Sequence, residues 1–302
     1  MLSAIPFAPG ALSPEVMERA IEAADRIGCA DRVLMQGESF PTSVGLDAMG
    51  EVASAFPIRA FKTYTHAAGA PWRLDDDTGD AYFAKVAAVG VPIVAVHKGL
   101  SGGDPWSSPV DVGPAAAAHP DIDLLVYHSG YENGVVEGPY DPAAPNGGID
   151  RLVASVVDAG LGAGDNVYAE LGSTWRSLMT RPDEAAHALG KLLLALGEDN
   201  ILWGTDSIWY GSPQDQIEAF RAFQITEEFQ ERFGYPALTA EVKAKILGRT
   251  AAELFAIDPT AGPCVADREA LDQLRAERRE QAVATFHTHA DAAAVAFEAS
   301  RH

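Results

Sequence analysis

The sequence predicts an α/β fold, a (β/α)₈ TIM barrel of about seven parallel strands, hence one strand short, followed by a helical C-terminal tail. Three observations predict it. Apolar, β-branched runs alternate with helical patterns, the order expected of parallel strands joined by crossover helices. No Gly-x-Gly-x-x-Gly follows the first strands, which disfavours an open doubly wound sheet. Polar residues stand at the carboxyl end of nearly every predicted strand, as on the functional face of a barrel.

The strand and helix segments follow one another at a regular period, roughly 25 to 45 residues from strand to strand. The predicted strands are residues 2–7, 32–37, 58–65, 92–97, 123–128, 167–171 and 201–205. The predicted helices are residues 15–27, 44–55, 78–89, 111–118, 149–159 and 183–196. Pro14 and Pro182 are typical of helix starts. Gly90 and Gly197 are typical of helix ends.

The barrel is expected to occupy residues 1–257, and a linker with a helical tail residues 258–302. The loops after three strands are long and rich in glycine and proline, and loops of this kind on the functional face usually cover a site. They are residues 99–110, 130–148 and 207–213.

Composition limits the partners of this 302-residue chain. Its formal charge of −21 repels polyanions, so neither nucleic acid nor an anionic membrane is an expected partner. No apolar run approaches membrane-spanning length, and no signal segment is apparent. Cys29 and Cys264 give no disulfide framework, which favours a reducing compartment and a cytoplasmic protein. A small-molecule substrate is expected, and a homo-oligomer is possible.

Three strand ends carry residues that suit a divalent metal ion. Strand alternation places His97, His128 and Asp206 each on the same face as the apolar residues before it. Two imidazoles and a carboxylate at strand exits are the donors of a hydrolytic metal site. We expect the three side chains to lie within about 4 to 7 Å of one another, the spread that a common centre allows.

Other polar and aromatic residues are candidates for the same face. Lys62 is either a functional lysine or half of an ion pair with Glu170 or Asp206. Asp206 itself has the alternative role of capping the next helix. The candidates for substrate contact are Tyr64, Lys98, Glu132, Glu170, Trp175, Arg176 and Trp209.

The motifs His97-Lys-Gly, Tyr127-His128-Ser-Gly and Trp203-Gly-Thr-Asp206-Ser together resemble the amidohydrolase superfamily. The likeness is strongest to its amidohydrolase-related branch, which includes aminocarboxymuconate-semialdehyde decarboxylase-like enzymes. It implies a (β/α)₈ barrel with a metal at the carboxyl face. His97, His128 and Asp206 then resemble the ligands of the fifth, sixth and eighth strands, and Asp206 also moves protons. Lys62 lies where binuclear members carry a bridging carboxylated lysine.

One family motif is missing from its usual place. The first strand of the family carries His-x-His, and this chain begins at what resembles the second strand. The chain is then a truncated form, a degenerate member, or a permuted one in which residues 283–291, with His287 and His289, supply that strand. The alternative for that segment is a tail helix with two exposed histidines.

The resemblance predicts a metal-dependent hydrolase, most simply with zinc, that cleaves a small carbon–nitrogen or ester bond. A metal-activated water attacks, and Asp206 takes its proton and returns it to the leaving group. The alternatives are a metal-dependent decarboxylase of an aromatic or unsaturated acid and a truncated, non-catalytic member. The open edge of the barrel is expected to be covered by residues 258–302 or by a second subunit.

Overall fold

The computed structural model describes residues 1, 3, 13–66, 71–143, 145, 147–258, 264–265, 267–277 and 279–280. It divides the chain into two compact units, Met1–Leu12 with Leu34–Ala261 and Ser13–Val33 with Gly262–His302. Most of the predicted strand 2–7 and all of the His-x-His segment 283–291 lie outside the described residues.

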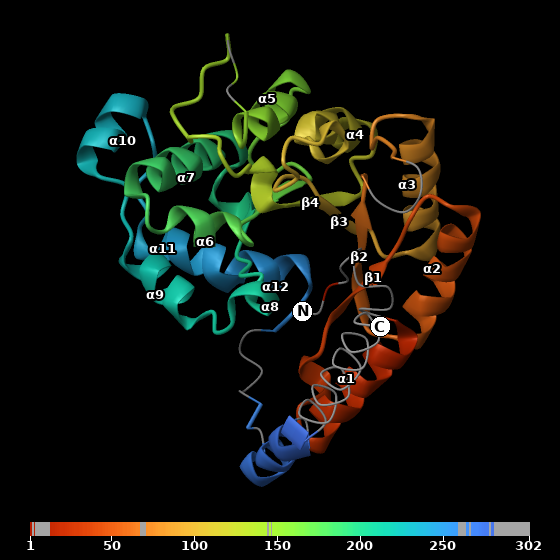
Figure 1. The fold of residues 1–302 in the computed structure, drawn as a ribbon. Helices are drawn as coiled ribbons and strands as arrows, with labels where there is room; N and C mark the ends of the chain where they lie inside the picture. Colours follow the sequence, from red (N-terminus) through yellow and green to blue (C-terminus); the bar gives the residue numbers. More distant parts are fainter. Residues whose placement is uncertain are drawn as a thin grey trace, which may run out of the picture. The chain divides into compact units, whose positions relative to one another are not determined.

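The first unit is built on one parallel sheet (Figure 1). Its strands are β1 (Met35–Glu38), β2 (Ile58–Tyr64), β3 (Ile93–His97), β4 (Asp123–Tyr127), β5 (Val167–Glu170) and β6 (Ile201–Leu202). They are hydrogen-bonded in the order β1-β2-β3-β4-β5-β6. A doubly wound sheet would reverse its order at a switch point, so the sequential order confirms the barrel class, with six strands among the described residues.

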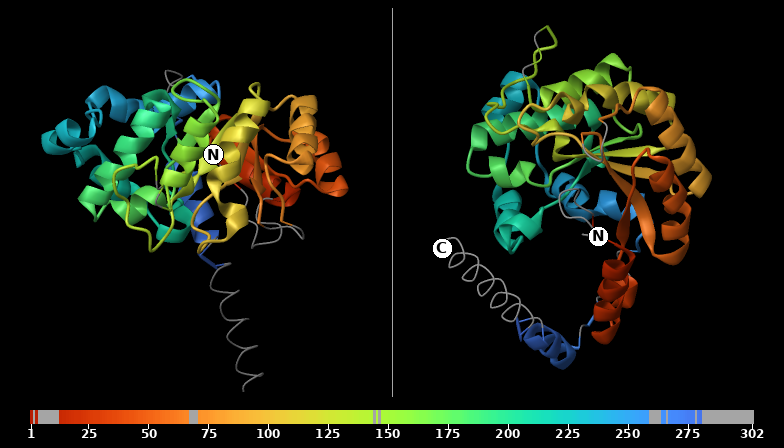
Figure 2. Two further views of the ribbon diagram at one scale, coloured as in Figure 1. Left: turned by 90° about the horizontal axis from the view of Figure 1, so that it is seen from above. Right: turned by 45° about the vertical axis from the view of Figure 1, so that its right-hand side comes forward.

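Helices follow the strands and cover the outer face of the sheet (Figures 1 and 2). They are α2 (Ser43–Ala55), α3 (Asp77–Val89), α4 (Val112–Ala118), α5 (Asp150–Asp158), α6 (Thr174–Leu178) and α7 (Pro182–Leu196). The segment after β6 adds α8 (Ser207–Tyr210), α9 (Gln214–Ala222), α10 (Glu227–Phe233), α11 (Ala240–Ala244), the π-helical η6 (Lys245–Arg249) and α12 (Thr250–Leu254). The helices predicted within this unit lie within two residues of these bounds.

Short 3-10 helices connect several of these elements. They are η2 (Pro105–Ser107), η3 (Pro109–Asp111), η4 (His128–Gly130) and η5 (Glu198–Asn200). The start of α3 shows how local chemistry sets a boundary. The Asp76 carboxylate accepts hydrogen bonds from the amides of Thr78 and Gly79, at 2.9 and 3.0 Å, and so satisfies two amides of the first turn.

The edge of β6 is covered from within the same unit. The Trp203 amide donates a 3.0 Å hydrogen bond to the Ile246 carbonyl in η6. Phe255, which follows α12, joins the core cluster that contains Ala95 and Leu202. η6 and Phe255 therefore contact the β6 end of the sheet, and cover of the remaining gap by residues 258–302 or by a second subunit stays a prediction. β6 has two residues, so it presents few unpaired backbone groups.

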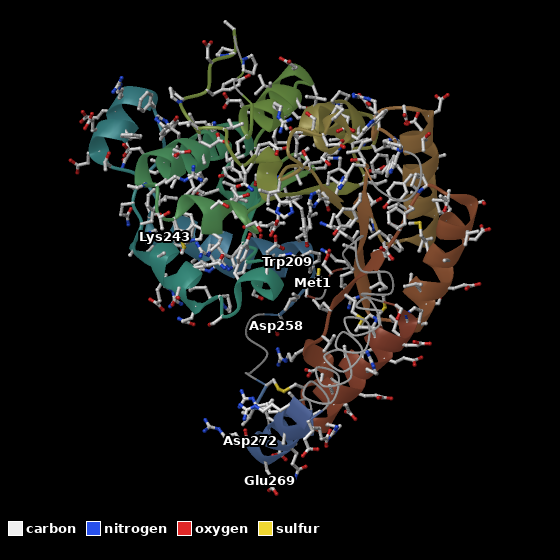
Figure 3. All side chains as sticks on the ribbon, viewed as in Figure 1. Met1, Trp209, Lys243, Asp258, Glu269 and Asp272 are labelled. Carbon is white, nitrogen blue, oxygen red and sulfur yellow. A yellow bond between two sulfur atoms is a disulfide. The ribbon has the colours of Figure 1, made fainter. Side chains whose placement is uncertain are left out.

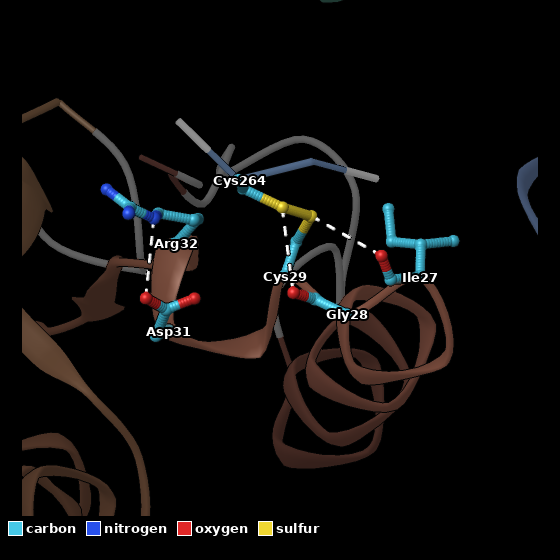
Figure 4. Close-up of a disulfide and its surroundings, with 6 residues drawn as sticks. All are labelled: Ile27, Gly28, Cys29, Asp31, Arg32 and Cys264. Carbon is cyan, nitrogen blue, oxygen red and sulfur yellow. Dashed lines mark hydrogen bonds and ion pairs between the residues drawn. A yellow bond between two sulfur atoms is a disulfide. The ribbon is translucent and has the colours of Figure 1, made fainter. Parts of the chain in front are cut away.

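The second unit joins helix α1 (Pro14–Arg26) and η1 (Ala30–Arg32) to a helical segment of the tail. Cys29 and Cys264 form a disulfide with Cα atoms 5.7 Å apart (Figure 4). The Arg26 guanidinium donates two hydrogen bonds to the Glu277 carboxylate, at 3.0 and 2.9 Å. The expectation that Cys29 and Cys264 give no disulfide framework is wrong. The 235-residue separation gave no local signal that the cysteines pair.

No helix in the described ranges combines the length and the apolar character needed to cross a membrane.

Candidate active site

One row of residues across the carboxyl ends of five strands forms the base of the site. Neighbours in the strand register face the same side of a sheet. The row consists of Tyr64, His97, Tyr127, Glu170 and Leu202. All five line a single cavity of about 580 Å³. The row therefore brings two phenols, an imidazole and a carboxylate to one face, as the sequence predicts for a barrel mouth.

The cavity has an apolar side and a polar side. Leu34, Leu125 and Phe255 contribute apolar wall, whereas Lys62 and Asp206 contribute charge. Met1 and Trp209, both labelled in Figure 3, also line it. Trp209 is 61% exposed, so it borders solvent at the cavity mouth. An aromatic-rich cavity with few charged groups is typical of a small-molecule site.

His97 and His128 are linked, and their hydrogen bonds determine which nitrogens carry protons. His128 Nδ1 lies 2.7 Å from the carbonyl oxygen of Gly172, which can only accept, so Nδ1 is the protonated nitrogen. His128 Nε2 is then an acceptor, and His97 Nδ1 donates to it at 3.1 Å. Burial lowers the pKa of both imidazoles, and their mutual repulsion lowers that of His97 further. Both rings are therefore neutral near pH 7.

The Asp206 carboxylate lies near Nδ1 of His128, the nitrogen that does not face His97. Asp206 Oδ2 lies 3.6 Å from His128 Nδ1 and accepts a 2.6 Å hydrogen bond from Ser173 Oγ. Asp206 occupies the N-cap position of α8, but its side chain makes no capping bond. The alternative role as a helix cap is therefore excluded.

The backbone around these groups is strained. His128, Ser129, Ser173 and Asp206 have φ between 50° and 67°, a region that side chains other than glycine rarely adopt. Such strain costs on the order of 1–3 kcal/mol per residue and gathers at functional sites. Contacts around these four residues therefore hold them against their backbone preference.

Glu170 is fixed by main-chain amides. Its Oε1 accepts from Gly172 N at 2.8 Å, and its Oε2 accepts from His128 N at 3.3 Å. Burial, followed by the nearby Asp206 charge, raises the pKa of Glu170 to about 7, against the opposing effect of Lys62. A Cβ added at Gly204 would lie 1.4 Å from Glu170 Oε1, so only glycine allows this carboxylate its position.

Lys62 is a buried ammonium that no carboxylate in the described part of the chain contacts. It is 1% exposed and lies one layer below the row, level with Ala95. Its Nζ is 3.2 Å from the Tyr127 ring centroid, and among the described residues it forms no hydrogen bond or ion pair. The alternative ion pair with Glu170 or Asp206 is therefore not formed. Burial lowers the pKa of Lys62 to about 7, although Glu170 and Asp206 act to raise it.

Four candidates for substrate contact do not line the cavity. The Lys98 ammonium is 2.8 Å from the buried Asp111 carboxylate, and Glu132 binds the Ser101 amide and Arg151. The other two are on α6: Trp175, which packs on Phe220 and Phe223, and Arg176, which lies over the Tyr210 ring. These four side chains hold neighbouring segments together around the site. Their positions after a strand in the sequence do not distinguish this role from substrate contact.

Four residues of the site were not singled out from the sequence. Ser173 donates to Asp206, Tyr210 is hydrogen-bonded to Ser173, and the Tyr127 ring lies against the Lys62 ammonium. Gln36 donates to the Tyr127 hydroxyl at 2.7 Å, and its buried Oε1 finds no hydrogen-bond partner within the described ranges. For Gln36 and Tyr127, the position at a strand end was the one sequence feature that could have indicated a place in the site.

The described residues do not complete a metal site. His97 Nδ1 and His128 Nε2 face one another, but Asp206 reaches the opposite nitrogen of His128. No group of three or more His, Cys, Asp or Glu side chains within the described ranges is arranged to hold a metal ion. A catalytic zinc usually needs three protein ligands, so the donor set found here falls short by one. The three predicted side chains do cluster, with His128 in contact with the other two.

Comparison with known proteins gives one family and several solved structures of low identity, two of which follow. The profile of the Amidohydrolase family matches residues 16–257. No curated protein matches the chain. An uncharacterised TIM-barrel protein from Bordetella bronchiseptica is 17% identical, with a TM-score of 0.47, over 83% of this chain and 85% of that one.

The second structure is that of 5-carboxyvanillate decarboxylase from Novosphingobium aromaticivorans, with bound manganese and a nitrobenzoic acid. It is 15% identical, with a TM-score of 0.45, over 80% of this chain and 72% of that one. At these values neither likeness assigns a reaction to the chain.

Proposed function

Since the chain belongs to the amidohydrolase family, we propose that it is an enzyme that decarboxylates a small aromatic or unsaturated acid in this cavity. One observation carries the proposal. Lys62 keeps an ammonium almost fully buried beside an aromatic-walled cavity, with no carboxylate of the described residues paired to it. Keeping such a charge buried is costly unless a ligand completes the pair.

A substrate carboxylate is the natural partner for this ammonium. Ammonium–carboxylate hydrogen bonds are short and about twice as strong as neutral ones, and the buried setting strengthens them further. The rings of Tyr64 and Tyr127 flank Lys62, and the wall of Leu34, Leu125 and Phe255 suits a flat apolar body. An acid with an aromatic or conjugated skeleton therefore fits better than a charged or strongly hydrated one.

The reaction is the exchange of a carboxylate for a proton, R–COO⁻ + H⁺ → R–H + CO₂. Asp206, in its protonated form, gives the proton to the carbon that bears the carboxylate. The carbon–carbon bond then breaks, its electron pair returns to the skeleton, and carbon dioxide leaves. The Asp206 side chain is 26% exposed, so it can regain its proton from solvent. Lys62 holds the carboxylate, and the apolar wall limits water at the reacting carbon.

Hydrolysis of a small carbon–nitrogen or ester bond is the second candidate. The linked neutral imidazoles of His97 and His128, with Asp206 beside them, favour it. A neutral imidazole can take a proton from an attacking water and return it to the leaving group.

A divalent metal ion is typical of the family, and zinc is the ion that the sequence favours. His97 Nδ1 and His128 Nε2 are its expected ligands, and the described residues offer no third ligand. The steps above therefore rest on the acids and bases of the chain itself. Cytoplasmic location and homo-oligomerisation stay predictions, and a disulfide such as Cys29–Cys264 is more typical of oxidising compartments.

Incubation with aromatic and conjugated acids labelled with ¹³C in the carboxyl group tests the proposal. Release of labelled carbon dioxide is expected from at least one acid, and Asp206→Asn should lower the rate by about 10²-fold or more. The matching amides and esters are assayed in parallel for amine or alcohol release. Turnover of these and of no acid would replace decarboxylation with hydrolysis.

A further inference from the structure

The Asp206 carboxylate is held by a serine that the proposed reaction does not use. Ser173 lies in the turn between β5 and α6 and is 2% exposed. Its Oγ donates to Asp206 Oδ2 at 2.6 Å, whereas His128 Nδ1 lies 3.6 Å from the same oxygen. A charge-assisted bond of this length is among the stronger kinds of hydrogen bond.

The direction of the neighbouring hydrogen bond follows from the single proton of the serine. Ser173 Oγ also lies 2.9 Å from the Tyr210 hydroxyl, where either oxygen could donate. A hydroxyl has one hydrogen, and the ionised Asp206 carboxylate can only accept, so before Asp206 takes up the proton that it delivers, Ser173 donates to Asp206 and Tyr210 donates to Ser173. A directed chain therefore runs from the partly exposed Tyr210 through Ser173 to Asp206.

The backbone on both sides of this bond is strained. Ser173 has φ 58° and ψ −33°, and Asp206 has φ 50° and ψ 38°. Positive φ disfavours any residue other than glycine, and it persists only where surrounding contacts over-determine it. The Ser173–Asp206 bond joins these two strained residues, so each holds the other in place.

We propose that Ser173 is a positioning residue, which orients the Asp206 carboxylate for proton transfer, and that Tyr210 fixes the direction of the serine hydrogen bond. This inference rests on the proposed function, because the proton that Asp206 moves belongs to that reaction. Without the serine hydroxyl, the carboxylate loses its closest partner. It is then free to turn toward His128 Nδ1, which lies 3.6 Å away.

Two deletions of the hydroxyl separate positioning from backbone strain. Ser173→Ala removes the hydroxyl and keeps the strain, whereas Ser173→Gly removes both. Positioning predicts that kcat falls about 10- to 100-fold in both variants while KM changes less than about threefold, since a misplaced proton donor affects the chemical step. Tyr210→Phe should lower kcat by a smaller factor. Ser177→Ala, on the same helix α6, is the matched control.

Two kinetic results would contradict the positioning role. Wild-type kcat in Ser173→Gly, with loss confined to Ser173→Ala, would assign the serine to backbone shape alone. A rise in KM with kcat unchanged would make it a binding residue. Either outcome overturns the positioning role.

A structural readout keeps this test independent of the substrate. Crystal structures of the wild type and of Ser173→Gly are compared, and the Asp206 carboxylate should turn away from its wild-type position by about 1 Å or more, enough to misalign a reacting proton. An unmoved carboxylate overturns the inference even if activity is lost. A turned carboxylate in a protein that releases neither carbon dioxide, amine nor alcohol overturns the proposed function and leaves the inference standing.

Discussion

Replacing Lys62 with methionine should make the protein more stable and less active. Methionine keeps the length of the side chain and removes the charge. Burial shifts the pKa of Lys62 from 10.5 to about 7, and each unit corresponds to about 1.4 kcal/mol, so the buried charge costs up to roughly 5 kcal/mol. Relaxation around the lysine reduces this figure, so we expect Lys62→Met to raise the free energy of unfolding by about 2–4 kcal/mol at pH 7.

The gain should depend on pH in a defined direction. The folded pKa lies below the unfolded value, so between about pH 7 and 10.5 the unfolded chain binds the extra proton and wild-type stability rises with pH. The advantage of Lys62→Met is therefore full below pH 7 and shrinks by pH 9.5. Urea unfolding at both pH values measures it, with Lys85→Met on α3 as control. A destabilised Lys62→Met protein at pH 7 would refute the reasoning, because it would mean that the ammonium has a stabilising partner.

Three further predictions concern packing, covalent structure and metal content. Gly204→Ala should destabilise the protein by about 1–3 kcal/mol, because its Cβ would lie 1.4 Å from Glu170 Oε1. The control is Gly50→Ala on α2, whose Cβ would meet nothing within 4 Å. Thermal unfolding compares the two variants, and equal stability would contradict the account. Reduction or Cys29→Ser should lower the free energy of unfolding by about 2–5 kcal/mol, because the bond closes a long loop, and thiol titration of the unreduced, denatured wild type should find no free thiol. Dialysis against EDTA should remove any zinc, since two imidazole nitrogens make a weak site, and elemental analysis that finds one zinc retained per chain would disprove this.

The fold class followed from the sequence because strand–helix alternation is a local pattern. Register then turns it into a site: once β3 and β4 are parallel neighbours, His97 and Tyr127 must share a face. His128, one residue later, reaches the same face only because its backbone takes a positive φ. Strand alternation grouped His128 with Leu124 and Val126, but the register pairs these two residues with Val94 and Val96, on the face opposite His97. The turn that brings the His128 ring to the site could not be read from the strand pattern.

The contacts around the site were less predictable because they come from distant segments. The sequence around Lys98 does not indicate that its ammonium binds the Asp111 carboxylate. The sequence around Asp206 does not indicate that Ser173 donates a hydrogen bond to it. A lysine at a strand end gives the same sequence signal whether it pairs, as Lys98 does, or has no ion-pair partner among the described residues, as Lys62 has none. Which of the two meets a substrate is decided by tertiary packing alone.

The central claim is that Lys62 receives a carboxylate, and the most direct test is a binding measurement. Isothermal titration compares benzoate with benzamide, and cinnamate with cinnamamide, in the wild type and in Lys62→Met. The acids should bind the wild type about 10- to 100-fold more tightly than their amides, the value of a charged hydrogen bond, and Lys62→Met should abolish the difference. Equal affinity of acid and amide in the wild type, or a preference for the acid that survives Lys62→Met, would contradict the claim.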